Sequence, residues 1–291
     1  GYTPVCTRDR QGPTKSSRNP LPPIPSHLRL PLAIGLFLLA HLCFGHLENP
    51  PMWGLDMLAY TPLWVEVAFV ALALLLLLPA FRRSAAAKLA GVDLWAGAQY
   101  WIFLLLLTAV GLAAFVGLRT ATHLLGDGDL MLRELSMQIP RMGNEPLALW
   151  ILRALYLGVV SWGASPEDVY RFYSYASGLL YLLIAFVVTP MLGKDRVQRL
   201  VAFGLLLTPG YLQLFCGYVE NYPLLFPGML LYFCGGLQYL RGRLPLWAVS
   251  CMLALLMVYH FIAVTLAPSL LILVLLRLFF VDGGRTVRIP T

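Results

Sequence analysis

Two aspartates stand one residue apart on a glycine-containing turn that follows a long apolar segment: Gly126-Asp127-Gly128-Asp129. Glycine lets the backbone bend sharply and approach a ligand closely. Carboxylates at this spacing can bind one metal ion together, or one can act as a general base while the other orients a cation or hydroxyl group. A solvated loop with two incidental acids is the alternative. Because only 12% of the residues are charged, the position of these acids favours a functional site.

A second group of polar side chains lies between two later apolar segments and consists of Tyr218, Glu220, Asn221 and Tyr222. The tyrosines and the asparagine can hydrogen-bond a sugar or hold the carboxylate in place. An aromatic turn at a membrane interface with an incidental glutamate is the alternative. His260, between the last two apolar segments, can contact a phosphate or pair with a carboxylate, although a single histidine near a helix end is more often structural.

The composition of the chain indicates a membrane protein that must position these residues with helices. Of its 291 residues 59% are hydrophobic, and the mean hydropathy is +0.75, whereas about a quarter of the residues of a soluble domain are charged. Lipid offers no partner to backbone amides, so helices must carry the crossings. The sequence therefore predicts an all-α, polytopic transmembrane bundle.

Eight apolar segments have about the length that a crossing requires. They cover residues 30–47, 63–81, 98–118, 168–191, 200–216, 222–240, 245–259 and 261–280. The last two segments can also be read as one broken helix.

The segments divide the chain into four parts. The sequence predicts a disordered basic tail at 1–26, a transmembrane hairpin at 27–97, a core at 98–280 with an outer loop at 119–167, and a cytoplasmic loop at 281–291. The outer loop mixes acids and bases, and its segments 130–139 and 147–162 are expected to be helices that lie along the membrane interface. Arg153, in the middle of the second helix, and the short length of that helix argue against a ninth span.

Basic residues in the short loops orient the chain. They follow the second, fourth, sixth and eighth segments, which places them on one face, and the positive-inside rule makes that face cytoplasmic; these residues are Arg82, Arg83, Lys88, Lys194, Arg196, Arg199, Arg241, Arg243, Arg285 and Arg288. The acidic turn, Glu220 and His260 then face the other side. This topology accounts for the net charge of +7, so no nucleic-acid partner is expected.

The order of several short motifs resembles the GT-C superfamily of membrane glycosyltransferases over about residues 98–280. The branch typified by protein O-mannosyltransferases and aminoarabinose lipid A transferases is the most similar. The motifs are the acidic turn, Asn144-Glu145-Pro146-Leu147, Trp150, Tyr156, Gly163-Ala164-Ser165, Arg171 and Ser177-Gly178-Leu179-Leu180.

The resemblance implies inverting transfer of a sugar from a polyprenyl-phosphate donor to a lipid, glycan or protein acceptor. It places the site on the outer face of a membrane, expected to be the bacterial inner (plasma) membrane. Asp127 or Asp129 takes the position of the catalytic carboxylate, and Arg133, Arg171 and His260 are the candidates to stabilise the leaving phosphate. The paired aspartates permit a divalent cation such as Mg²⁺ or Mn²⁺, which some relatives use.

Two departures from the family pattern and one competing class qualify this prediction. Two extra spans precede the matching part, and the chain ends where family members continue, which predicts a fragment that is inactive by itself. A polytopic transporter or lipid flippase is the alternative function. Its ionisable residues are expected at the middle of spans, often beside Gly or Pro, whereas the acids here cluster at one face.

Overall fold

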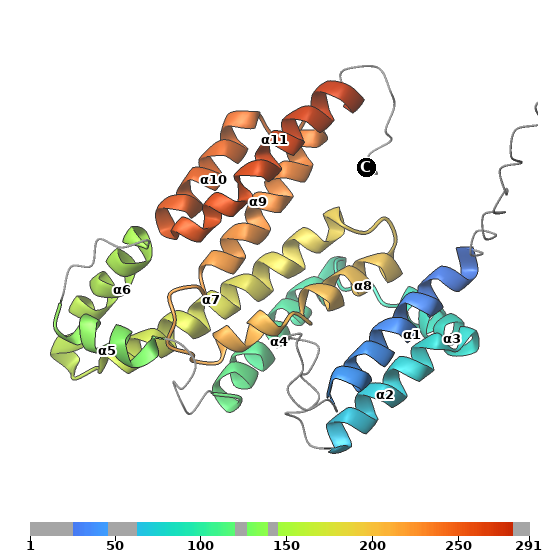
Figure 1. Cartoon of the computed structure of the whole chain (residues 1–291), viewed down its shortest axis with the longest axis horizontal. Coiled ribbons are helices and arrows are strands. Elements are labelled where there is room, and N and C mark those ends of the chain that lie inside the picture. Colours follow the sequence, from blue (N-terminus) through green and yellow to red (C-terminus); the bar gives the residue numbers. More distant parts are fainter. Residues whose placement is uncertain (1–25, 46–62, 120–126, 139–144, 282–291) are drawn as a thin grey trace, which may run out of the picture. The chain divides into compact units, whose positions relative to one another are not determined.

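A computed structural model of the chain describes residues 26–45, 63–119, 127–138 and 145–281, and every regular element in these ranges is a helix (Figure 1). The all-α prediction is confirmed for the described part of the chain. Contacts within the chain define two compact units, residues 1–85 and 86–291, and each is described by itself.

The first unit contains α1 (Ser26–Gly45), α2 (Leu63–Leu77) and the start of α3 (Pro79–Ala90). α1 packs against α2, with His41 between two phenylalanine rings at centroid distances of 4.4 and 6.2 Å. The chain bends by 86° between α2 and α3. Pro79 begins α3, as expected of a residue that has no backbone N–H to donate.

The second unit contains eight α-helices among its described residues, connected in places by short 3₁₀ segments. They are α4 (Gly97–Gly117), α5 (Gly128–Ser136), α6 (Pro146–Val159), α7 (Pro166–Val188), α8 (Arg196–Leu206), α9 (Leu225–Leu240), α10 (Leu246–Tyr259) and α11 (Ala267–Leu276). α7 is central, because α4, α5, α6, α8 and α9 all pack against it, while α10 packs against α6, α9 and α11.

The local sequence explains where α7 begins. Ser165 and Asp168 form a capping box, in which each side chain hydrogen-bonds the backbone N–H of the other residue, and Pro166 occupies the first helical turn. This arrangement satisfies amide groups that the first turn leaves without helical partners. The 23 residues of α7 extend for about 34 Å, at about 1.5 Å per residue.

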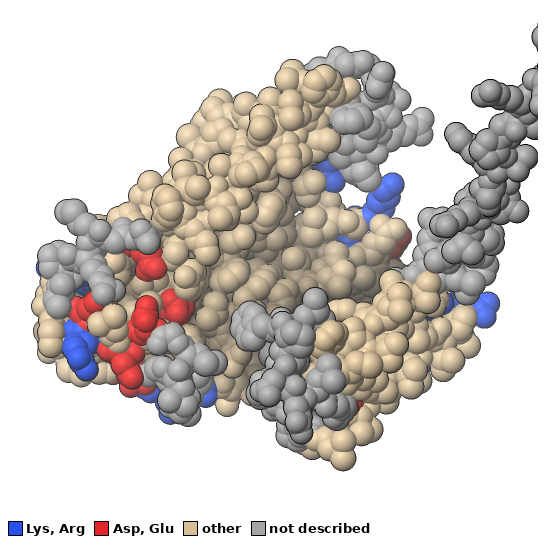
Figure 2. All heavy atoms as spheres, in the orientation of Figure 1, with Lys and Arg blue, Asp and Glu red and all other residues tan. Residues whose placement is uncertain are grey.

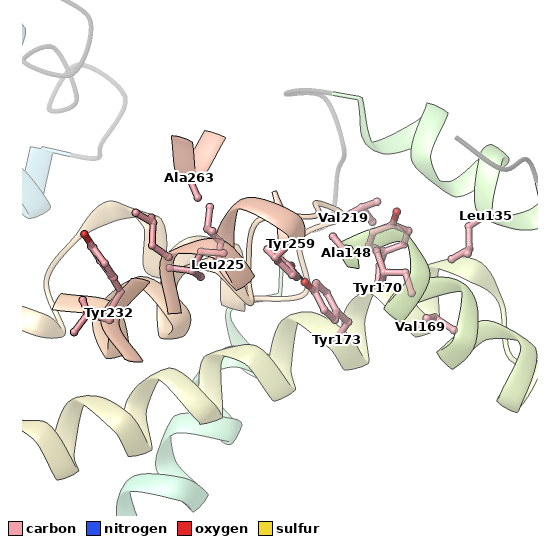
Figure 3. Packing of buried hydrophobic residues seen from close by; sticks show 14 of the residues in the cluster. Leu135, Ala148, Val169, Tyr170, Tyr173, Val219, Leu225, Tyr232, Tyr259 and Ala263 are labelled. Atoms are coloured by element: carbon pink, nitrogen blue, oxygen red, sulfur yellow. Dashed lines mark hydrogen bonds between the residues drawn. The ribbon is translucent and has the colours of Figure 1, made fainter. Parts of the chain in front are cut away.

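Two clusters of buried side chains pack along opposite halves of α7. Tyr170 and Tyr173 in its first half belong to a cluster shared with α5, α6, α9 and α10 (Figure 3). Tyr181 and Phe186 in its second half belong to a cluster shared with α4 and α8. Between the clusters, a Cβ atom on Gly178 would come within 2.6 Å of the side chains of Phe115 and Phe215, so these elements can pack only against a glycine.

The predicted count of eight spans is not confirmed. Three helical stretches are long and apolar enough to cross a membrane, and the bent pair that α2 and α3 form makes up to four; the three are Gly97–Gly117, Pro166–Met191 and Phe261–Phe279. Four further apolar helices of the described chain have 10–17 residues, fewer than the roughly 20 that a perpendicular crossing needs.

Interruptions of the backbone explain part of the difference. The predicted span 200–216 is divided, because α8 ends at Leu206 and a 3₁₀ segment begins at Gly210, directly after Pro209. At the end of α10, His260 has an extended backbone, with φ −152° and ψ 124°. The last two apolar segments are therefore separate helices.

The exposed surface of α4 is apolar, as expected where a helix faces lipid. Trp101 and Leu105 expose 69% and 71% of their area. In the outer loop, the two predicted helices are present as α5 and α6, and α6 is not long enough to count among the spans. Their position at a membrane interface stays a prediction.

Candidate functional site

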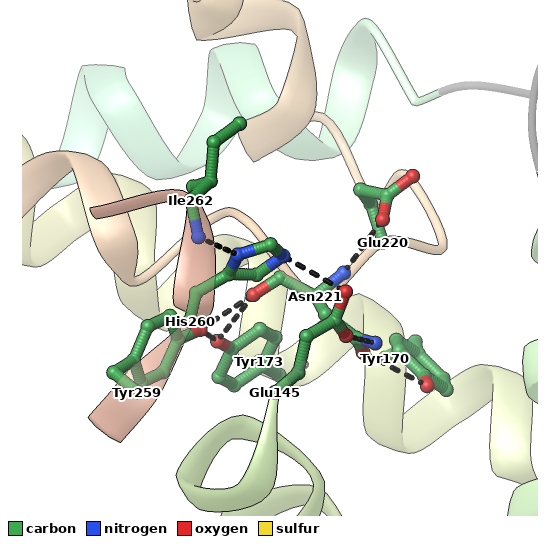
Figure 4. A network of polar contacts seen from close by, with 8 residues as sticks. All are labelled: Glu145, Tyr170, Tyr173, Glu220, Asn221, Tyr259, His260 and Ile262. Atoms are coloured by element: carbon green, nitrogen blue, oxygen red, sulfur yellow. Dashed lines mark hydrogen bonds and ion pairs between the residues drawn. The ribbon is translucent and has the colours of Figure 1, made fainter. Parts of the chain in front are cut away.

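Polar side chains from four elements meet at the first turns of α7 (Figure 4). Glu145 is the N-cap residue of α6, and Tyr170 lies in α7. Asn221 lies in the segment 216–224 before α9, which we call the site loop. His260 lies between α10 and the following 3₁₀ segment. These positions are distant in the sequence, and only the fold brings them together.

Asn221 is the centre of this network and is 2% exposed. Its side-chain N–H group donates a hydrogen bond to Oε2 of Glu145, and its Oδ1 accepts one from the hydroxyl of Tyr170 at 3.2 Å. Its backbone carbonyl accepts from the hydroxyls of Tyr173 at 3.2 Å and Tyr259 at 2.5 Å. Buried polar groups need such partners, and together they fix the site loop against α6, α7 and α10.

His260 is 4% exposed and fixes Glu145. Its Nε2 lies 2.8 Å from Oε1 of Glu145, an ion-pair distance whose angle falls outside hydrogen-bond geometry. Its Nδ1 accepts a hydrogen bond from the backbone N–H of Ile262 at 3.1 Å. A neutral imidazole with Nδ1 as acceptor carries its proton on Nε2, the ring nitrogen that lies beside the carboxylate of Glu145.

The ring of His260 also stacks on Tyr222, with 4.6 Å between the centroids. Both nitrogens and one face of the imidazole are thus occupied by the protein. Of the two contacts that the sequence suggested for His260, a phosphate or a carboxylate, the structure shows the carboxylate, that of Glu145.

Glu220 is the carboxyl group of the site loop that lies next to this network. Its Oε1 accepts a hydrogen bond from the backbone N–H of Asn221 at 3.1 Å. Burial raises the pKa of Glu220, the hydrogen bond from Asn221 opposes that shift, and the negative charges of Glu145 and Asp127 add to it. The carboxyl group therefore holds its proton more tightly than an ordinary glutamate.

Asp127 is the N-cap residue of α5, and its side chain is exposed and makes no capping hydrogen bond. Its charge contributes to raising the pKa of both Glu220 and Tyr222, although burial is the largest cause in each case. The charges of Glu145 and Asp127 thus both act on the pKa of Glu220, and a site that Asp127 or Asp129 shares with Glu220 stays a prediction. We call these three carboxyl groups the acidic site.

The site loop owes its shape to a buried serine and a glycine. The hydroxyl of Ser174, in α7, accepts a hydrogen bond from the backbone N–H of Gly217 at 2.9 Å and donates one to the carbonyl of Leu214 at 2.7 Å. Gly217 has φ +73°, and a Cβ atom there would come within 2.9 Å of the Tyr175 hydroxyl. A glycine is therefore required where the chain turns into the site loop.

The remaining predicted site residues of the outer loop and α7 are not part of this network. Asp129 lies exposed in the first turn of α5, and Arg133 lies exposed in its last turn. Arg171 pairs with two acids of its own helix, Glu167 and Asp168, the latter at 3.5 Å. Tyr218 is half-buried in the site loop.

The rest of the acidic turn, including Gly126, lies outside the described residues. In the part of the chain that the structure describes, no three His, Cys, Asp or Glu side chains are arranged to hold a metal ion. A cation at Asp127 and Asp129 stays a prediction.

Glu145 is the functional residue that sequence reasoning did not single out. Glu145 directly precedes Pro146, the first residue of α6. A proline preceded by an acid is a sequence signal for the start of a helix, and it could have drawn attention to Glu145. On the face that Figure 2 shows, Asp and Glu side chains gather near α5 and α6 with Lys and Arg beside them.

No protein-family model, curated protein or solved structure matches the chain. The function is therefore argued from the site.

Proposed function

We propose that the protein is an integral membrane glycosyltransferase that moves a sugar from a polyprenyl-phosphate donor to a hydroxyl group of a lipid, glycan or protein. The observation that carries this proposal is the convergence of Asp127, Glu145 and Glu220 at one end of α7, a helix long enough to cross a membrane. A lipid-linked donor holds its sugar at the membrane surface, where such an end lies. The resemblance to GT-C enzymes leads to the same reaction class.

Asp127 is the residue best suited to act as the base. Its carboxylate is exposed, so it is open to an acceptor, and its charge acts on the pKa of Glu220. Asp129 lies exposed in the first turn of α5, beyond the N-cap position that Asp127 occupies. We therefore assign the base to Asp127 and a supporting role to Asp129.

The reaction transfers one proton and exchanges one bond. Asp127 accepts the proton of the acceptor hydroxyl as its oxygen forms a bond to the anomeric carbon. The bond between that carbon and the donor phosphate breaks, and the phosphate leaves with the electron pair on the opposite side of the ring. The product has inverted configuration, and the polyprenyl phosphate remains in the membrane.

Neighbouring residues supply binding and charge. Glu220, Tyr218 and Tyr222 line the site loop and can bind sugar hydroxyl groups. Arg133, at the other end of α5, can attract the leaving phosphate, while Arg171 is held by carboxylates of α7. A divalent cation at Asp127 and Asp129 would serve the same purpose as Arg133.

The proposal is tested in the full-length gene product, reconstituted in liposomes with polyprenyl-phosphate sugars and candidate acceptors. We expect Asp127→Asn to lower turnover by about 100-fold or more, the usual contribution of a general base, and Asp129→Asn and Glu220→Gln to have smaller effects. Asp195→Asn, at the N-cap of α8, makes the same chemical change away from the site and should keep wild-type turnover. Wild-type turnover in a folded Asp127→Asn variant would contradict the assignment.

A transporter or flippase is the second candidate, and one observation favours it. The hydroxyls of Tyr170, Tyr173 and Tyr259 converge on Asn221 beside the Glu145–His260 pair, and such a chain of polar groups can conduct protons. Proteoliposomes loaded with a pH-sensitive dye distinguish the two functions. A proton-coupled transporter should change the internal pH when its lipid substrate moves without any acceptor, whereas sugar transfer should release protons only when donor and acceptor are both present.

A further inference from the structure

Glu145 has no free oxygen with which to act on a substrate. One oxygen faces Nε2 of His260 at 2.8 Å, and the other accepts the side-chain N–H of Asn221. The side chain is 20% exposed. The carboxylate of Glu145 therefore interacts with other side chains of the protein, whereas the carboxylate of Asp127 is exposed.

The two partners of Glu145 require a carboxylate. Nε2 of His260 carries the proton, because Nδ1 accepts from Ile262, and the amide of Asn221 must present its N–H group to Glu145, because its Oδ1 accepts from Tyr170. Two donor groups thus lie beside one carboxylate, the Asn221 amide as its hydrogen-bond donor and His260 Nε2 at an ion-pair distance of 2.8 Å. A glutamine there would satisfy one donor with its oxygen and oppose the other with its own NH₂ group.

Asn221 links Glu145 to Glu220, the residue that directly precedes it in the chain. The backbone N–H of Asn221 donates a hydrogen bond to the side-chain carboxyl of Glu220. When the side chain of Asn221 is held by Glu145 and Tyr170, and its carbonyl by Tyr173 and Tyr259, the direction of that N–H is fixed. The carboxyl of Glu220 is therefore oriented by contacts that begin at Glu145.

We propose that Glu145 is the positioning residue of the acidic site: acting through Asn221, it orients the Glu220 carboxyl toward the position of the substrate, and His260 holds Glu145 in place. The inference rests on the proposed transferase function for its catalytic consequence, whereas the orientation of Glu220 is testable without any substrate. A residue that positions a functional group is identified by the loss of function that follows when it is replaced.

Several titratable groups face Glu220 besides Glu145. Asp127 comes from α5, Tyr218 and Tyr222 from the site loop, and Tyr170 from α7, which senses the charge of Glu220. Losing the negative charge of Glu145, or releasing the site loop into water, lowers the pKa of Glu220 in either case. The pH at which half of Glu220 is protonated therefore shows whether Glu145 acts on it.

The substrate-free experiment uses a hydrophobic carbodiimide on the full-length protein in liposomes. The reagent reacts with protonated carboxyl groups, since the acid proton moves to a carbodiimide nitrogen as the carboxyl oxygen bonds to its central carbon. Labelling of Glu220 is measured by peptide mass spectrometry as a function of pH. We expect Glu145→Gln to move the labelling midpoint to lower pH, and the matched carboxylate-to-amide change Asp195→Asn to leave it unchanged.

A second variant separates position from charge and serves if Glu145→Gln fails to fold. Glu145→Asp keeps the negative charge but shortens the side chain, so it loses the reach to Asn221. We expect it to lower kcat of sugar transfer by about 10- to 100-fold, the effect of a displacement of about 1 Å, with KM close to that of the wild type. A purely electrostatic role predicts wild-type kcat for this variant.

The outcomes distinguish the two proposals. An unchanged labelling midpoint in folded Glu145→Gln, or wild-type kcat in Glu145→Asp, overturns the positioning role. If the wild type transfers no sugar from any donor while Glu145→Asp, which keeps the charge, still moves the labelling midpoint of Glu220 to lower pH, the transferase proposal fails and the positioning of Glu220 stands.

Discussion

At the scale of single residues, the three carboxyl groups of the acidic site have different environments. Asp127 is exposed, Glu220 is half-buried with a raised pKa, and Glu145 is bound by His260 and Asn221. Environments that separate the proton affinities of neighbouring acids are typical of sites that transfer protons. Each difference leads to a measurable effect.

Glu220 makes stability depend on pH in a defined direction. Its pKa in the folded protein is raised above 4.5, so the folded state binds the proton more tightly, and this favourable contribution is lost as pH rises through the folded pKa. We expect Glu220→Gln, which cannot ionise and can still accept from Asn221, to raise the melting temperature at neutral pH. The difference from wild type should disappear below pH 4.5, and a lower melting temperature at neutral pH would contradict the shift.

Ser174 supports the site loop from within α7. It is 0% exposed and satisfies the backbone groups of Gly217 and Leu214. We expect Ser174→Ala to destabilise the protein by about 1–3 kcal/mol, because both groups would stay buried without a partner. Thermal melting in detergent measures this loss, and the exposed Ser161→Ala serves as the control that should melt like the wild type.

At the scale of elements, α7 positions the site and also holds the rest of the second unit together. At Gly178, Phe115 of α4 and Phe215 of the 3₁₀ segment before the site loop approach α7 so closely that an added Cβ atom would lie 2.6 Å from each side chain. We expect Gly178→Ala to cost about 1–3 kcal/mol through forced displacement of Phe115 and Phe215. Gly158→Ala in α6 is the matched control, because its Cβ would meet nothing within 4 Å. Equal melting temperatures of the two variants would contradict this packing.

The sequence predicts helices well and interruptions poorly. The long apolar segments 98–118 and 168–191 locate α4 and α7, since hydropathy is a local signal. The break at Pro209 and the extended residue His260 shorten segments that hydropathy alone reads as spans. Hydropathy averages over a window and is insensitive to one residue that interrupts the backbone hydrogen bonds.

Individual acidic residues of the candidate site could be recognised in the sequence, whereas the contacts between its residues could not. Asp127 and Glu220 stand out because charges are rare in this chain. Glu145 does not, because its importance depends on Asn221 and His260, which lie far along the sequence and approach it only after α9 and α10 pack. Long-range pairing of this kind leaves no local pattern in a single sequence.

At the scale of the whole second unit, α7 separates two chemically different ends. The acidic site lies at its first turns, and the basic turn with Lys194 and Arg196 follows its last. With about 34 Å between the ends of the helix, we expect Ser161→Cys to react with an impermeant maleimide from outside intact cells, and Lys194→Cys only after permeabilisation. Both side chains are exposed, and the reverse pattern would contradict the orientation.

The central claim is our inference that Asp127 lies nearer to Glu220 than Asp129 does, since the charge of Asp127 acts on the pKa of Glu220. A short thiol cross-linker tests it most directly in full-length protein whose natural cysteines are replaced by serine or alanine. The account predicts that the pair Asp127→Cys with Glu220→Cys cross-links rapidly and the pair Asp129→Cys with Glu220→Cys slowly. Faster cross-linking of the Asp129 pair, or none in either pair, would contradict a shared acidic site.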